Sequence, residues 1–139
     1  MAGERILVVD DEPANLRLME RVLRSHGYEV MTAEDAVAAM RALEASPVDL
    51  LILDLGLPGM DGLALTRRLR ADERWRSLPI VAWTAYAMTS DEARARAAGC
   101  DDFLSKPVGI NQILAVVARN LRNGAPGPSG GIPRGSTGD

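Results

Sequence analysis

The chain has 139 residues, of which 19 are acidic and 16 basic, and its net charge is −3. This length allows one domain, and a hydrophobic fraction of 47% supplies a core, which excludes a disordered acidic chain. The acidic balance argues against nucleic acid as a direct partner, and the single cysteine, Cys100, excludes a disulfide-stapled miniprotein.

The first apolar run of the chain, Ile6–Val9, is too short to be a targeting segment. A signal peptide needs an apolar region of about 7–15 residues, and a membrane span needs about 20. A lone cysteine also suits a reducing compartment. We therefore expect a cytoplasmic chain that makes no membrane contact.

Short apolar runs predict the strands. Runs without alternation are typical of parallel strands that are covered on both faces. In chain order the sequence contains Ile6–Val9, the weaker Tyr28–Thr32, Leu50–Leu53, Ile80–Trp83 and the shorter Phe103–Leu104.

Helical stripes of apolar residues separate these runs. Pro13 lies near the expected start of the first helix, where proline is favoured. The stripes are Leu16, Met19 and Leu23; Ala36, Met40 and Leu43; Leu65 and Leu69; and Ile110, Ile113, Leu114, Val117 and Leu121.

One further stretch, Thr89–Ala98, predicts a helix with a weak apolar face. A capping-box pattern opens it, and Gly99 provides a typical stop. Its inward residues are expected to be Ala93 and Ala97, which offer little apolar area. This helix is therefore expected to be the least firmly docked.

The order β-α repeated five times predicts an α/β fold, a parallel sheet with helices on both faces and right-handed crossovers. The folded domain is expected to span residues 1–122. Residues 123–139 contain six glycines and three prolines, and they cannot bury enough surface to offset their ordering entropy. They are interpreted as a flexible tail, the stub of a linker or an artificial extension.

The residues that follow the strands carry the chemistry, because ligands of open parallel sheets bind beyond the carboxyl ends of the strands. Three carboxylates, a hydroxyl and the only lysine of the chain follow four of the predicted strands, so all are expected at this edge. They are Asp10, Asp11, Asp54, Thr84 and Lys106.

Such a cluster of carboxylates needs a cation, because two like charges 4 Å apart repel by about 4 kcal/mol at an effective dielectric constant near 20. Mg²⁺ prefers oxygen ligands and is usually held by one or two carboxylates together with a substrate phosphate. A carboxylate, Mg²⁺ and a positioned ammonium group suit phosphoryl transfer to an aspartate. Taken alone, however, Asp10 and Asp11 could equally be helix caps.

Four sequence pieces resemble the CheY-like receiver domain of two-component response regulators. They are ILVVDDE at 6–12, DLGLPGMDG at 54–62, Thr84–Ala85 and Lys106–Pro107, and the resemblance covers residues 5–121. It implies a flavodoxin-like, doubly wound (βα)5 sheet with strand order 2-1-3-4-5, in which Asp10, Asp11 and Asp54 converge.

The resemblance also implies a role for each site residue. Asp54 resembles the phosphoacceptor, and Thr84 and Lys106 resemble the hydroxyl and the lysine that engage the phosphoryl group. Phe103 matches the aromatic switch position. For the Mg²⁺ site, the implied ligands are Asp11, Asp54, the backbone carbonyl of Gly56 and, through water, Asp10. The bond between Lys106 and Pro107 is expected to be cis, as in the family.

The implied function is a phosphorylation-dependent signalling switch that takes part in its own phosphotransfer and dephosphorylation, rather than an enzyme. The expected phosphoryl donor is a sensor histidine kinase or a histidine phosphotransfer protein. The output is expected to pass to a downstream protein through the Thr89–Ala98 helix, the Phe103–Leu104 strand and the last helix. No basic recognition helix or second core follows residue 122, so a single-domain regulator is expected.

The chain could equally be a receiver cut from a longer regulator or hybrid histidine kinase, with the tail as its linker. Classes other than a receiver fit less well. A phosphatase that uses an aspartyl phosphate resembles an Asp-x-Asp motif, whereas Leu55 and Gly56 follow Asp54. A flavodoxin-like cofactor binder would place a phosphate beside Asp10 and Asp11, which would repel it. The P-loop motif of nucleotidases is absent.

Overall fold

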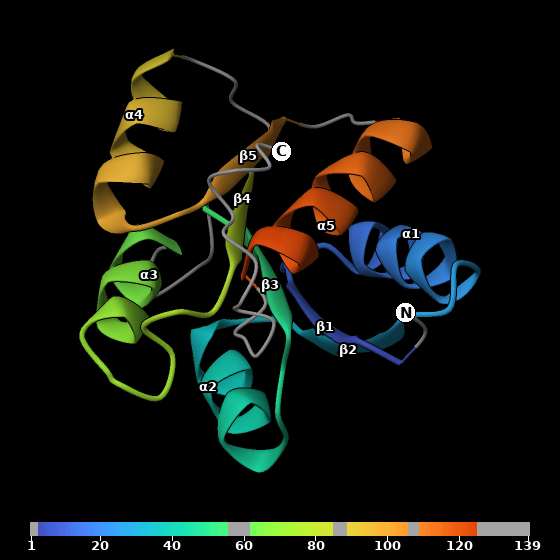
Figure 1. The fold of residues 1–139 in the computed structure, drawn as a ribbon, viewed down its shortest axis with the longest axis horizontal. Helices are drawn as coiled ribbons and strands as arrows, with labels where there is room; N and C mark the ends of the chain where they lie inside the picture. The colour runs from blue at the N-terminus through green and yellow to red at the C-terminus, as the bar shows by residue number, and fades with distance from the viewer. Residues whose placement is uncertain (1–2, 56–61, 85–88, 106–108, 125–139) are drawn as a thin grey trace.

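A computed structural model describes residues 3–55, 62–84, 89–105 and 109–124 of the chain (Figure 1). Strands and helices alternate through all ten elements. The strands are β1 (Arg5–Val9), β2 (Glu29–Ala33), β3 (Leu50–Asp54), β4 (Ile80–Thr84) and β5 (Asp102–Ser105), and the helices are α1 (Pro13–Arg24), α2 (Ala36–Ala45), α3 (Gly62–Arg70), α4 (Thr89–Ala98) and α5 (Ile110–Gly124).

The five strands form one parallel sheet in the order β2-β1-β3-β4-β5. Ile6 of β1 lies beside Leu50 of β3, and Ile52 of β3 lies beside Val81 of β4. Every residue of β3 and β4 is buried, as expected for central strands covered on both faces. The predicted flavodoxin-like fold and strand order are therefore confirmed.

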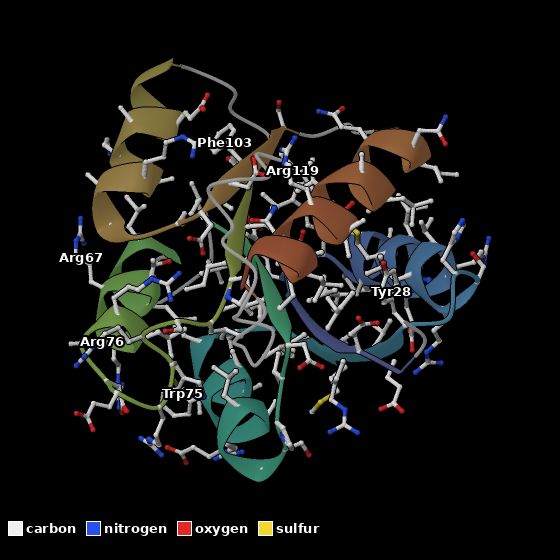
Figure 2. The ribbon with its side chains drawn as sticks, in the orientation of Figure 1. Tyr28, Arg67, Trp75, Arg76, Phe103 and Arg119 are labelled. Carbon is white, nitrogen blue, oxygen red and sulfur yellow. The ribbon has the colours of Figure 1, made fainter. Side chains whose placement is uncertain are left out.

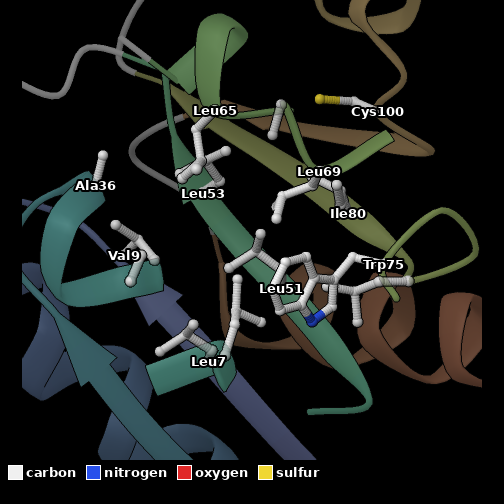
Figure 3. Packing of buried hydrophobic residues seen from close by; sticks show 14 of the residues in the cluster. Leu7, Val9, Ala36, Leu51, Leu53, Leu65, Leu69, Trp75, Ile80 and Cys100 are labelled. Atoms are coloured by element: carbon white, nitrogen blue, oxygen red, sulfur yellow. The ribbon is translucent and has the colours of Figure 1, made fainter. Parts of the chain in front are cut away.

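Two apolar clusters fill the space between the sheet and its helices. On one face, α2, α3 and α4 cover side chains such as Leu7, Leu51 and Leu53, and Trp75 from the α3–β4 connection closes this cluster (Figure 3). On the other face, α1 and α5 cover a second cluster that includes Ile52 and Trp83 (Figure 1). In this three-layer arrangement the helices cover both faces of the sheet, and the amino and carboxyl ends of the strands stay uncovered by them. Below, the side of the sheet where the strands end is called its carboxyl edge.

The predicted stripe of the last helix is wrong at one position. Ile110 was expected in the core, but its side chain is 52% exposed. Ile113 and Val117 are buried as predicted, and Val116 and Asn120 are buried on the same face. Because Ile110 is the first residue of α5, it lies where the helix starts to approach the sheet, and the burial begins one turn later.

The predicted inward face of α4 is also wrong. Ala95 and Ala98 are buried, whereas Ala93 and Ala97 are exposed. The predicted stop is confirmed, because Gly99 adopts a positive φ of 117°. With two alanines as its buried side chains among those described, α4 has the small apolar contact that the sequence predicts.

α5 extends to Gly124, and residues 125–139 lie outside the described residues. The division into a domain and a tail therefore stays a prediction. Among the helices described, none is long and apolar enough to cross a membrane.

Candidate functional site at the carboxyl edge of the sheet

Three adjacent strands deliver the candidate site. Asp10 follows the last residue of β1, Asp54 is the last residue of β3, and Thr84 is the last residue of β4. Since β3 lies between β1 and β4, all three side chains are carried to the same edge of the sheet.

Asp10, Asp11 and Asp54 form a compact acidic cluster. One carboxylate oxygen from each lies within 4.8 Å of the others. Asp10 has no exposed surface and Asp54 has 7%, whereas Asp11 is exposed. A cation can therefore approach from the Asp11 side and meet two carboxylates fixed in the protein, an arrangement that suits a hard ion with part of its water shell retained.

Hydrogen bonds hold Asp10 from two directions. The Glu12 N–H donates to Oδ1 at 2.9 Å, and the Asn15 side-chain amide donates to Oδ2 at 3.2 Å. The N-cap residue of α1 is Glu12, and its side chain makes no cap hydrogen bond. Neither Asp10 nor Asp11 is therefore the N-cap of α1, which weakens the interpretation of this pair as helix caps alone.

Asn15 is a site residue that the sequence analysis missed. It lies in the first turn of α1, where an amide is commonplace, and no motif marks it. Its spacing places it in the helical turn that follows the acidic pair, but spacing alone does not predict the hydrogen bond to Asp10.

Gly62 is a second residue that the motif did not explain. A Cβ atom at this position would lie 2.7 Å from the carbonyl oxygen of Asp54 and 2.7 Å from Cα of Leu55. Only glycine therefore lets the start of α3 pack directly on the end of β3. Any larger residue would push against the backbone that carries Asp54.

The predicted switch residues lie on neighbouring strands. Thr84 is 5% exposed and lies beside Ser105 of β5, while Phe103 of β5 lies beside Ala82 of β4. Phe103 is partly buried and packs against the apolar cluster under α3 and α4 (Figure 2). Phe103 therefore lies on the strand next to Thr84, two residues before the register partner of Thr84.

Gly56, Lys106 and Pro107 lie outside the described residues. Their predicted roles, including the cis Lys106–Pro107 bond, stay predictions.

A family model for the response regulator receiver domain matches residues 6–118. The chain belongs to this family. Receivers are signalling modules of two-component systems, and this one carries its acidic cluster inside the matched region.

Two kinds of relative match this receiver. The sensor protein GacS of Pseudomonas syringae pv. syringae is 43% identical over 129 residues, which cover 88% of this chain and 14% of that protein. The polar-differentiation response regulator DivK of Brucella ovis is 31% identical and is covered over 94% of its length. The chain therefore corresponds to a small part of a sensor protein and to nearly all of a short response regulator.

Solved structures agree with the fold. The receiver domain of the sensor histidine kinase PA1611 from Pseudomonas aeruginosa matches with a TM-score of 0.79 and 38% identity, covering 86% of this chain and 98% of that one. In that structure a magnesium ion is coordinated in the active-site cleft. The chemotaxis protein CheY4 of Vibrio cholerae matches with a TM-score of 0.81 and 26% identity, covering 86% of this chain and 99% of that one.

Proposed function

We propose that this receiver accepts a phosphoryl group from a phosphohistidine donor onto Asp54, with Mg²⁺ bound at the acidic cluster. The observation that carries the proposal is the convergence of three carboxylates within 4.8 Å at the carboxyl edge of the sheet, in a chain of the receiver family. A carboxylate oxygen of Asp54 forms the new bond to phosphorus, and the phosphorus–nitrogen bond of the donor breaks.

The exposure of the three carboxylates supports different roles for each. Asp11 is exposed and would ligate Mg²⁺ directly, together with Asp54 and the backbone carbonyl of Gly56. Asp10 is buried, and both of its oxygens already accept a hydrogen bond, so it would contact the ion through water. When bound, Mg²⁺ would neutralise charge on the acceptor and on the transferring phosphoryl group.

The protein's own residues would then turn the modification into a signal. Phosphorylation adds about −1.5 to −2 charges at Asp54. Thr84 and Lys106 would engage the phosphoryl oxygens, and Phe103 would follow Thr84. The output would be a shift of the face formed by α4, β5 and α5, read by a downstream protein.

The chain spans 14% of the GacS sensor protein and 50% of the transcriptional regulatory protein KdpE of Mycobacterium tuberculosis. We therefore propose partners by class. The donor would be a sensor histidine kinase or a histidine phosphotransfer protein, and the receiver would act in the cytoplasm as a switch rather than as an enzyme. It would serve either as a single-domain regulator or as a module of a longer protein.

Incubation with acetyl phosphate and Mg²⁺, followed by intact-mass spectrometry, tests this function. We expect one phosphoryl group on the wild type and none on Asp54→Asn. Asp49→Asn provides a matched control, because Asp49 directly precedes the amino end of the same strand. Equal labelling of Asp54→Asn would refute the assignment, and multiple turnover of varied phosphoesters would favour an aspartyl-phosphate phosphatase.

A further inference from the structure

Among the contacts of the Asp10 carboxylate are two hydrogen bonds from α1 and its approach, one from a backbone N–H and one from a side chain. The Glu12 N–H holds Oδ1, and the Nδ2 group of Asn15 holds Oδ2 at 3.2 Å. A carboxylate bound at one oxygen can still pivot about that bond. A carboxylate bound at both oxygens is fixed in its plane, and each oxygen keeps a lone pair for a further contact.

We propose that Asn15 is a positioning residue for the metal site, which acts by holding Asp10 in the orientation that faces Asp11 and Asp54. This inference rests on the proposed function, because it concerns the Mg²⁺ that the site would hold. Asn15 itself is assigned no contact with the ion.

Electrostatic repulsion explains why Asp10 needs this support. Pairs of carboxylates about 5 Å apart repel by roughly 3 kcal/mol at an effective dielectric constant near 20. Without the hydrogen bond from Asn15, the Asp10 carboxylate would be less restrained and would relieve this repulsion by turning away from Asp11 and Asp54. The ion would then have to bring it back, and part of the binding free energy would be lost.

The helix itself does not need the Asn15 side chain. The backbone N–H of Asn15 already donates to the carbonyl oxygen of Glu12 at 3.0 Å, and that of Leu16 donates to the same oxygen at 3.2 Å. The side-chain amide of Asn15 donates its hydrogen bond to Asp10 Oδ2 and not to a group of the helix. A substitution that removes the amide is therefore expected to leave α1 intact.

The chain offers a matched control in a second asparagine–aspartate pair. Asn120 of α5 donates to Asp102 Oδ2 of β5 at 2.9 Å, just as Asn15 donates to Asp10. This second pair lies outside the acidic cluster. Asn120→Ala removes the same kind of hydrogen bond without touching the proposed metal site.

Binding of Mn²⁺, measured by the loss of the free-ion electron paramagnetic resonance signal and by competition with Mg²⁺, tests the inference on the full chain. Loss of a hydrogen-bond partner of a direct metal ligand typically weakens metal binding by 10–100-fold. Because Asp10 would reach the ion through water, we expect an effect at the lower end of this range. We expect Asn15→Ala to weaken Mn²⁺ and Mg²⁺ binding about tenfold, and Asn120→Ala to leave both affinities within twofold of the wild type. Circular dichroism at the same temperature checks that both variants are folded.

The possible outcomes separate the two proposals. If the wild type binds Mn²⁺ and Asn15→Ala binds it with the same affinity, the positioning role is overturned, and the proposed function is unaffected. Equal weakening in Asn15→Ala and Asn120→Ala also overturns it, because the effect would then follow general loosening of the fold. A wild type that takes up no Mn²⁺ overturns the proposed function itself.

Discussion

Lys106 is the one lysine among 16 basic residues, and the other 15 are arginine. The proposed mechanism gives this exception a reason. An ammonium group is a compact, strongly hydrated point charge, whereas a guanidinium group is planar and bulkier. In the proposed mechanism Lys106 shares its pocket with Mg²⁺ and a phosphoryl group, so the two cations would not be interchangeable there.

We therefore predict that Lys106→Arg impairs function although it keeps the charge. The phosphorylation-dependent response should fall at least about tenfold, because the cation no longer meets the phosphoryl oxygens in the required geometry. Binding of the downstream protein with and without acetyl phosphate would measure this effect. A normal response in Lys106→Arg would contradict the argument from composition, and it would leave Asp54 and the acidic pair unaffected.

Single side chains also set the limit of what the sequence could predict at the site. Asp10, Asp11, Asp54 and Thr84 could be located because each follows an apolar run and parallel strands end at one edge. The contact between Asn15 and Asp10 could not, because it depends on the rotamers of two side chains and on the angle at which α1 leaves β1.

Among the elements, α4 combines a weak apolar face with a strong anchor at its carboxyl end. Arg70 of α3 donates to the carbonyl oxygen of Gly99 at 2.9 Å and to Asp101 Oδ2 at 2.8 Å. Asp101 Oδ2 also accepts from the backbone N–H of Ile80 at 2.9 Å. The end of α4 farthest from the site is thus tied to α3 and β4, which suits a helix that pivots about this end.

We predict that Arg70→Gln loosens α4 without changing the metal site. The substitution removes several hydrogen bonds, and we expect the free energy of unfolding to fall by about 2–3 kcal/mol. Hydrogen exchange of the amides of α4 should become faster, while Mn²⁺ affinity stays at the wild-type value.

Arg74→Gln is the matched control for this prediction. Arg74 also pairs with an aspartate, Asp72 at 2.8 Å, but on the exposed α3–β4 connection. The Arg74→Gln substitution should leave hydrogen exchange of the α4 amides unchanged. Equal acceleration in both variants would show that Arg70 has no special part in anchoring α4.

The same helix shows why an inward face can escape prediction. Four alanines, at positions 93, 95, 97 and 98, give the sequence no contrast between faces. The anchor at Gly99 and the packing against α3 decide that Ala95 and Ala98 face inward. In α1, by contrast, Leu16, Met19 and Leu23 stand out against charged neighbours, and all three are buried as predicted.

At the scale of the whole molecule, strand order could be anticipated only through the resemblance. The apolar runs predict a parallel sheet, but they do not say which strands are neighbours. Pairing of β1 with β3 depends on crossover connections on opposite faces, and it is this pairing that brings Asp10 and Asp54 together. The local pattern therefore predicts the elements, while the site depends on their arrangement.

The response of the whole fold to acid depends in part on Asp102. Burial alone would raise the pKa of Asp102, but hydrogen bonds from Arg119, Asn120 and the Phe103 N–H outweigh it and lower the pKa. A carboxyl group with a lowered pKa stabilises the folded state above its unfolded pKa of about 3.9. This contribution is lost as the pH falls through the folded pKa.

We predict that Asp102→Asn lowers the free energy of unfolding by about 1–2 kcal/mol at pH 7. The difference from the wild type should shrink as the pH falls below about 4, because Asp102 of the wild type then becomes protonated. Urea unfolding at a series of pH values measures this. A difference that stays constant down to pH 2 would show that charge on Asp102 is not the source of the effect.

The most direct test of the central claim is to map the phosphorylated residue. Borohydride reduces an aspartyl phosphate to homoserine, so trapping after treatment with acetyl phosphate and Mg²⁺ marks the acceptor permanently. We predict homoserine at position 54 alone, and none when Mg²⁺ is chelated. Homoserine at position 10 or 11, or an unmodified chain in the presence of Mg²⁺, would contradict the account.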